Sequence, residues 1–172
     1  MRLRLEMALL RNRDVYVILV SDQADPQEAD ALIRVARLDA GTAERAIRAV
    51  SDLFVYPRLI GFGYWDIHAL CRGRELHFAC GSALGKDRQM RAVEDAIAAL
   101  QIRSLAKADA VLVSVGSGGS MTLDEVDHAI NRVRNLLPRH CDLVCGNFVD
   151  VTLGDEMHVS ILAGGAMRSA NE

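Results

Sequence analysis

The sequence has no hydrophobic run long enough to cross a membrane. Its longest apolar run near the start is VYVILV, at residues 15–20, whereas a membrane-spanning helix needs roughly 20 apolar residues. A secretory signal peptide is not expected either, because charged residues flank this run and no small-residue cleavage site follows it. These absences predict a cytoplasmic protein that does not associate with membranes.

Cysteine is scarce, with four residues among 172. A disulfide framework needs a smaller chain with a denser cysteine pattern, so the four thiols are expected to be reduced. Cys141 and Cys145, next to His140, have a spacing that invites a zinc interpretation, but on a strand they would lie roughly 13 Å apart. That is too far for two ligands of one ion. No CxxC pair is present, and we expect no metal.

A strong excess of charge of either sign is also missing. The formal net charge is −3, from 20 basic and 23 acidic residues, which gives no electrostatic reason to expect a nucleic-acid partner. The sequence has no low-complexity tract and no repeat of solenoid period. With 51% hydrophobic and 25% charged residues, the composition is typical of a globular chain, and the length fits one domain.

The standard motifs of nucleotide binding and nucleophilic catalysis are absent. GSALGKDR, at residues 81–88, has three residues before its Gly-Lys pair, whereas a phosphate-binding loop has four and continues with Ser or Thr. VGSGGSM, at residues 115–121, precedes a helix but has no Lys or Arg nearby, so it is a poor anion site. No serine occupies a G-x-S-x-G turn. We therefore expect no catalytic residue and no cofactor.

The N-terminal part of the sequence contains one predicted strand and two predicted helices. Residues 15–20 predict a strand buried on both faces. Asp25-Pro26 predicts the start of a helix whose apolar side lies within residues 32–36. A second helix is predicted from Thr42 to the residue before Pro57, unless the two are one long helix bent at Gly41.

From residue 66 onward the periodicity predicts strands with two helices between them. Strands are expected at 67–71, 76–81, 110–115, 142–147 and 158–162, and helices at 88–102 and 122–137. Thr122 and Glu125 predict a capping box at the start of the second helix. This order predicts an α+β fold, a two-layer α/β sandwich in which a four- to five-stranded mixed sheet carries two helices on one face.

Four segments resemble one known family in order and with few gaps. They are AVSDLFVYPRLIGFGYWDI (49–67), GSALGKDRQMRAVEDAI (81–97), KADAVLVSVGSGGSMTLDEVDHAI (107–130) and CDLVCGNFVDVTLGDEMHVSILAGG (141–165). They resemble parts of the bacterial cell-division protein FtsZ, of the tubulin superfamily. The first resembles the end of the family's central helix and its synergy loop, the second a glycine-rich turn and helix, the third a strand and helix start, and the last the two closing strands.

The resemblance implies a domain organisation. Residues 39–165 correspond to the FtsZ/tubulin C-terminal domain with its leading helix. Residues 1–38 are then an N-terminal strand-and-helix appendage, and residues 166–172 a disordered tail. The GGGTGTG signature of the family's GTP-binding half is absent, so no GTPase site is expected. A GTP-binding half encoded by a neighbouring gene remains an open alternative.

The synergy loop departs from the family pattern. In the family, acidic side chains of this loop enter the nucleotide site of the next filament subunit. Only Asp66 stands at one of the family's three polar positions, which implies a remnant that caps or orients the turn. Phe62, Tyr64 and Trp65 make the loop apolar, and Tyr and Trp are typical of binding hot spots. We predict a partner-binding loop of Phe62, Tyr64, Trp65 and Asp66, with inward packing of the rings as the alternative.

The sequence therefore favours a non-catalytic FtsZ-like protein that acts by protein–protein association in cell division or filament assembly. FtsZ itself, or a second copy of the chain in a homo-oligomer, is the expected partner. The alternative is a small-molecule-binding protein or enzyme that reuses the sandwich fold as a homo-oligomer. That alternative predicts a pocket that collects Arg72, Arg74, Lys86, Arg88 or a histidine.

Overall fold

The computed structural model describes residues 16–23, 29–61, 63–100 and 105–166. Within these ranges the strands are β1 (Ile18–Ser21), β2 (Ala31–Arg34), β3 (Arg74–Ala83), β4 (Ala110–Ser117), β5 (Asp142–Val149) and β6 (Met157–Ala166). The helices are α2 (Ala40–Val55), α3 (Tyr64–Cys71), α4 (Arg88–Leu100) and α6 (Leu123–Arg134), with a short 3₁₀ helix η2 at Val151–Leu153. No helix in these ranges is long and apolar enough to cross a membrane.

The strands form one mixed sheet in the order β1-β2-β3-β6-β4-β5. β1, β2 and β3 are parallel to one another, and β5 is parallel to β4. β6 lies between β3 and β4 and is antiparallel to both. The four strands β3, β6, β4 and β5, with α4 and α6 on one face, are the sandwich predicted from the sequence. β1 and β2 extend this sheet to six strands.

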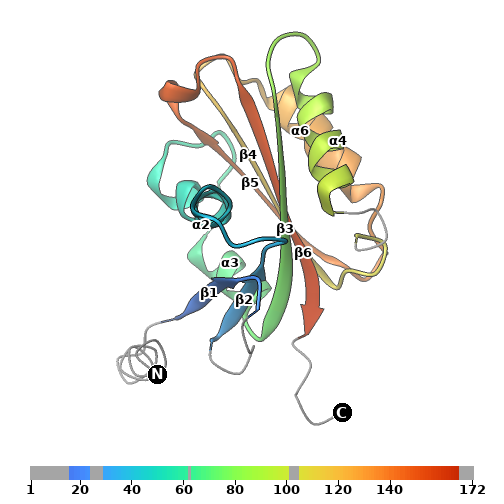
Figure 1. Ribbon diagram of the computed structural model, residues 1–172. Coiled ribbons are helices and arrows are strands. Elements are labelled where there is room, and N and C mark those ends of the chain that lie inside the picture. Colours follow the sequence, from blue (N-terminus) through green and yellow to red (C-terminus); the bar gives the residue numbers. More distant parts are fainter. Residues whose placement is uncertain (1–15, 24–28, 62, 101–104, 167–172) are drawn as a thin grey trace.

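Helices cover both faces of the sheet (Figure 1). α4 and α6 pack on one face, where Val111, Val113 and Val115 of β4 are buried. α2 and α3 pack on the other face, where Ala110 and Leu112 of the same strand are buried. Successive residues of a strand point to opposite faces, so the continuous apolar run of β4 serves both cores. The α+β class is confirmed, but α2 and α3 add a third layer that the sequence did not predict.

The helix predicted to start at Asp25-Pro26 is wrong over the part that the structure describes. Ala31–Arg34 is strand β2, which pairs with β1 and β3. Leu32 and Ile33 are neighbours in sequence and are 0% and 1% exposed, as expected for a strand covered on both faces. A short apolar run of this kind does not distinguish a helix from a strand by its periodicity. Asp25 and Pro26 themselves lie outside the described residues.

The strand predicted at residues 67–71 is instead part of helix α3. Ile67, Leu70 and Cys71 are its buried residues, and this i, i+3, i+4 spacing is that of one helix face. The segment is only eight residues long, so its pattern was too short to discriminate between the two periods.

The limits of the other N-terminal elements also differ from the prediction. α2 begins at Ala40, because Asp39 caps it by accepting a hydrogen bond from the N–H of Thr42 at 2.9 Å. Gly41 thus lies in its first turn, and no long bent helix forms. β1 is an edge strand and is half-buried rather than buried on both faces. All four cysteines are free, as predicted. Residues 1–15, and residues 167–172 of the predicted tail, lie outside the described residues.

Candidate functional site

The segment between α2 and α3 runs along the edge strand β5. The N–H of Val149 donates to the carbonyl of Pro57 at 2.7 Å, and the N–H of Ile60 donates to Oδ1 of Asn147 at 2.8 Å. These two hydrogen bonds hold the loop against β5 and thereby fix where α3 begins. Asn147 is fully buried. Sequence reasoning missed it, and the only available signal was a polar residue inside an apolar strand.

Asp66 caps α3. Its Oδ2 atom accepts a hydrogen bond from the N–H of Gly63 at 2.7 Å, and its own N–H donates to the carbonyl of Gly63 at 3.2 Å. A carboxylate in the first turn satisfies an N–H group that the helix start leaves free, and it lies favourably in the helix dipole. The capping role expected from the sequence is confirmed.

The rings that follow Gly63 are exposed. Trp65 is 74% exposed and Tyr64 is 51% exposed, while Phe62 lies outside the described residues. Inward packing, the alternative left open by the sequence, is therefore wrong for these two rings. Large aromatic side chains are usually buried in a core or an interface, where they contribute strongly to stability or binding. Two neighbouring exposed rings are therefore unusual for a folded protein.

Five rings lie together here and form what we call the aromatic patch: Tyr16, Phe54, Tyr64, Trp65 and His68. His68 is central, with its ring centroid 4.5 Å from that of Tyr16, 5.8 Å from Tyr64 and 5.7 Å from Trp65. The ring of Phe54, on α2, lies 6.4 Å from that of Tyr64. The sequence did not predict Tyr16, Phe54 or His68 in this site, because their elements meet only in the folded chain.

α2 carries exposed apolar side chains beyond the patch. Ile47 is 53% exposed and Val55 is 72% exposed. Ile47 precedes Phe54 by seven residues, so the two share a helix face. A different face of α2 is buried against the sheet through Ala46, Ala49 and Leu53. A helix that is apolar beyond its core-facing stripe has surface for a second contact.

Burial shifts the pKa values of two groups in and beside the aromatic patch. Burial raises the pKa of the Cys71 thiol to about 11. Burial, with nearby Cys71 and Asp30, also raises the pKa of Tyr16 above its usual value, so both groups stay protonated at neutral pH. Among the residues that the structure describes, no cluster of three or more His, Cys, Asp or Glu has the arrangement of a metal site.

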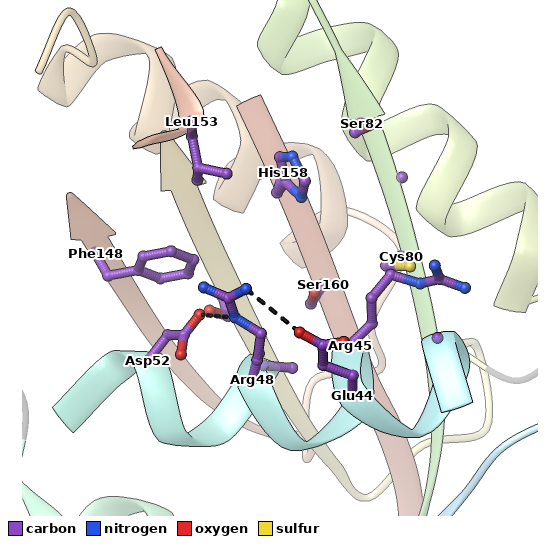
Figure 2. A pocket seen from close by; sticks show the side chains of 14 residues that line it. Glu44, Arg45, Arg48, Asp52, Cys80, Ser82, Phe148, Leu153, His158 and Ser160 are labelled. Atoms are coloured by element: carbon purple, nitrogen blue, oxygen red, sulfur yellow. Dashed lines mark hydrogen bonds and ion pairs between the residues drawn. The ribbon is translucent and has the colours of Figure 1, made fainter. Parts of the chain in front are cut away.

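A cleft of about 540 Å³ lies between α2 and the sheet (Figure 2). The roof is formed by side chains of α2, and the floor by side chains of the strands. Of the groups that the sequence assigned to a pocket, the cleft contains a histidine, His158, and none of the basic residues Arg72, Arg74, Lys86 and Arg88. Arg88 is instead buried and paired with Glu125 at 2.8 Å.

Similar sequences point to one family. A sequence model described as "FtsZ family, C-terminal domain" matches residues 75–167. The "Cell division protein FtsZ" of Wolbachia pipientis is 36% identical over 123 residues, which are 69% of this chain and 39% of that protein. The protein of the same name from Mycoplasmopsis pulmonis is 25% identical over 159 residues, which are 91% of this chain and 41% of that protein.

Solved structures show the same fold. The "FtsZ dimer, empty" of M. jannaschii has a TM-score of 0.77 at 16% identity, covering 94% of this chain and 58% of that one. CetZ2 from Haloferax volcanii, a GTPγS-bound protofilament, has a TM-score of 0.56 at 19% identity, covering 98% and 61%. At these identities the likeness concerns the fold alone. This chain spans about two-fifths of the length of these two curated relatives. Through the sequence of its C-terminal domain, the chain belongs to the FtsZ family.

Proposed function

We propose that this chain acts by association with an FtsZ-family subunit in cell division and does not itself turn over GTP. The observation that carries the proposal is the 74% exposure of Trp65 within the aromatic patch. Contiguous exposed apolar surface on a folded protein usually marks an interaction site. Trp and Tyr are also the residues most enriched among those that dominate binding energy.

The way the loop is held supports its role as an anchor. Hydrogen bonds from Val149 to Pro57 and from Ile60 to Asn147 fix the loop on β5, and Asp66 fixes the start of α3. Side chains presented from a fixed backbone lose less conformational freedom on binding, which favours affinity. The aromatic patch is therefore preorganised for a partner.

The same loop supports the non-catalytic part of the proposal. A carboxylate that positions or activates water must direct a free oxygen at it. Asp66 is the only acidic residue that the resemblance places at the family's polar positions, and one of its oxygens is committed to the N–H of Gly63. The two residues that precede Asp66 in this loop, Tyr64 and Trp65, are aromatic rather than acidic.

We propose two partners of the same kind, FtsZ itself and a second copy of this chain. The fold neighbours named above are described as a dimer and as a protofilament, which supports association between subunits of this fold. The proposed associating domain comprises residues 39–165, with residues 1–38 as an appendage, and the proposed location is the cytoplasm.

Co-sedimentation with polymerising FtsZ tests the proposal, with GTP turnover followed in the same samples. The wild-type chain should sediment with the filaments or change their turnover, and Trp65→Ala should weaken either effect roughly tenfold or more. Leu123→Ala is the matched control, since Leu123 is 56% exposed on α6, across the sheet from the aromatic patch. No effect of the wild-type chain on either readout removes FtsZ as a partner. A monomeric solution mass removes the second copy.

A further inference from the structure

The floor of the cleft is polar, although the middle of that sheet face is apolar. Leu76 of β3 and Leu162 of β6 are core residues on the α2 side. Further along the same face, the register sets Cys80 of β3 opposite Ser160 of β6, and Ser160 opposite Ser114 of β4. Three small polar side chains therefore form a row across three neighbouring strands, and all three line the cleft.

A second row lies beside the first. Ser82 of β3 is opposite His158 of β6, and His158 is opposite Gly116 of β4. Because residue 116 is glycine, the ring of Phe148 occupies the space where a side chain of residue 116 would lie. The ring closes the β5 end of the cleft. The cleft is thus a hollow with a polar floor and one aromatic wall.

One polar atom of the floor is buried without a hydrogen-bond partner. Ser114 is 1% exposed, and its hydroxyl oxygen has no partner among the described residues. His158, in the second row, has its Nε2 atom 3.3 Å from Oε2 of Glu156, and after the Ser82 hydroxyl this contact helps to hold the pKa of Glu156 below its usual value. An unpartnered buried polar group is destabilising. The Ser114 hydroxyl on the floor of a cleft is explained if a ligand provides its partner.

Arg45 is the basic side chain of the roof that makes no close ion pair with a described residue. Arg48 is committed, because it pairs with Asp52 at 3.0 Å, with Asp150 at 3.4 Å and with Glu44 at 3.7 Å. Arg45 donates to the hydroxyl of Thr42 at 3.3 Å. Its charge acts at longer range on Asp39, whose pKa is lowered first by the N–H of Thr42 and in part by Arg45. Figure 2 shows the two guanidinium groups pointing in opposite directions from α2, Arg48 toward Asp52 and Arg45 away from it.

We propose that this cleft binds a small organic anion, with the carboxylate or phosphate group at Arg45 and polar groups of the remainder at Ser114 and His158. One guanidinium without a close ion pair matches one anionic group, and hydroxyl and imidazole groups match hydroxyl or carbonyl oxygens. The volume of about 540 Å³ is that of sites for metabolite-sized molecules. The cleft and the aromatic patch share no residue, so this site stands independently of the proposed function.

Calorimetric titration of the full chain with three related molecules tests the site. Glucose 6-phosphate, gluconate and glucose share a six-carbon polyol skeleton and carry a phosphate, a carboxylate or no charge. Saturable binding of at least one anion at millimolar concentration, with none of glucose, is the expected result, and the preferred anion identifies the acidic group. Binding of glucose as tightly as the anions, or no saturable binding of either anion, overturns the proposal.

Variants connect any binding to the named residues. Arg45→Gln should weaken anion binding roughly tenfold or more, and Ser114→Ala should weaken it several-fold. Arg37→Gln is the control, since Arg37 is an exposed arginine just before α2 that does not line the cleft. Without ligand, Ser114→Ala should have an unchanged or higher Tm, because it removes an unpartnered hydroxyl. Undiminished binding by Arg45→Gln, or equal loss in Arg37→Gln, contradicts the assignment.

Discussion

Oδ2 of Asp66 lies 2.7 Å from the backbone nitrogen of Gly63, and this hydrogen bond closes the first turn of α3. The carboxylate that the family resemblance singles out therefore serves the backbone of its own helix. Tyr64 and Trp65 lie between the two residues, in the turn that the bond closes. The bond thus fixes the backbone that presents the two exposed rings.

Asp66→Ala should lower the free energy of unfolding by about 1 kcal/mol, the usual cost of losing a side-chain cap. Asp66→Asn keeps an acceptor oxygen at the same place and should recover most of that loss. Urea unfolding of both variants beside the wild type measures the difference. Equal stability of Asp66→Ala and the wild type would show that the cap contributes nothing in solution.

Trp65→Ala should change the free energy of unfolding by no more than about 0.5 kcal/mol, because the side chain is 74% exposed. Leu70→Ala, in the same helix but at a position 2% exposed, should cost roughly 2–5 kcal/mol. Urea or thermal unfolding compares the two. A loss for Trp65→Ala as large as that for Leu70→Ala would assign the ring to folding rather than to partner binding.

The sequence predicted the elements whose signals are local. Thr122 and Glu125 form the predicted capping box at α6, and β4 is the strand expected from its apolar run. β2 and α3 were assigned to the wrong class because each is short and owes its conformation to its neighbours. Leu32 and Ile33 point to opposite faces of the sheet and are both buried, which four residues of sequence do not reveal.

The same contrast between local signals and contacts made only in the fold applies to the candidate sites. The loop of Tyr64, Trp65 and Asp66 could be found from its composition and its resemblance to the family. The cleft could not, because its floor depends on strand register. Cys80 and Ser114 reach the same row only through Ser160, a residue of the last strand. No pattern within one segment predicts such a row.

Arg88 should be one of the most sensitive positions for stability. Its guanidinium donates to both carboxylate oxygens of Glu125 at 2.8 and 3.0 Å, and to the carbonyl of Asp155 at 2.7 Å, so it ties α4 to α6 and to the β5–β6 connection. Arg88→Gln should cost about 3 kcal/mol because it leaves these partners unmatched. Arg88→Lys should recover only part of this, since an ammonium lacks the planar fork.

A more exposed ion pair on the same helices is the control for Arg88. Arg132 pairs with Glu94 at 2.5 Å, and Arg132→Gln should cost at most about 1 kcal/mol. Chemical unfolding of the three variants gives the comparison. Similar losses for Arg88→Gln and Arg132→Gln would contradict the importance assigned to the buried fork.

Gly81→Ala should destabilise the contact between β3 and α4. A Cβ at this position would collide with the carbonyl oxygen of Ala92 and would lie 2.7 Å from Cβ of Asp95. The helix must then move, at a cost of about 1–3 kcal/mol or more. Gly61→Ala is the control, because among the described residues no atom beyond its chain neighbours lies within 4 Å of a Cβ there, and its unfolding midpoint should match the wild type. An unchanged Tm for Gly81→Ala would show that α4 adjusts freely.

Stability should fall as the solution becomes acidic, and Glu125 should account for part of the slope. Hydrogen bonds from Arg88 hold the pKa of Glu125 below its ordinary value of 4.5. The unfolded chain therefore takes up this proton more readily than the folded one, so the stabilisation is complete above about pH 4.5 and is lost as the pH falls toward the folded pKa. Glu125→Gln should show a smaller loss of unfolding free energy than the wild type when urea titrations are compared at neutral and acidic pH. A wild-type slope in Glu125→Gln would refute the link.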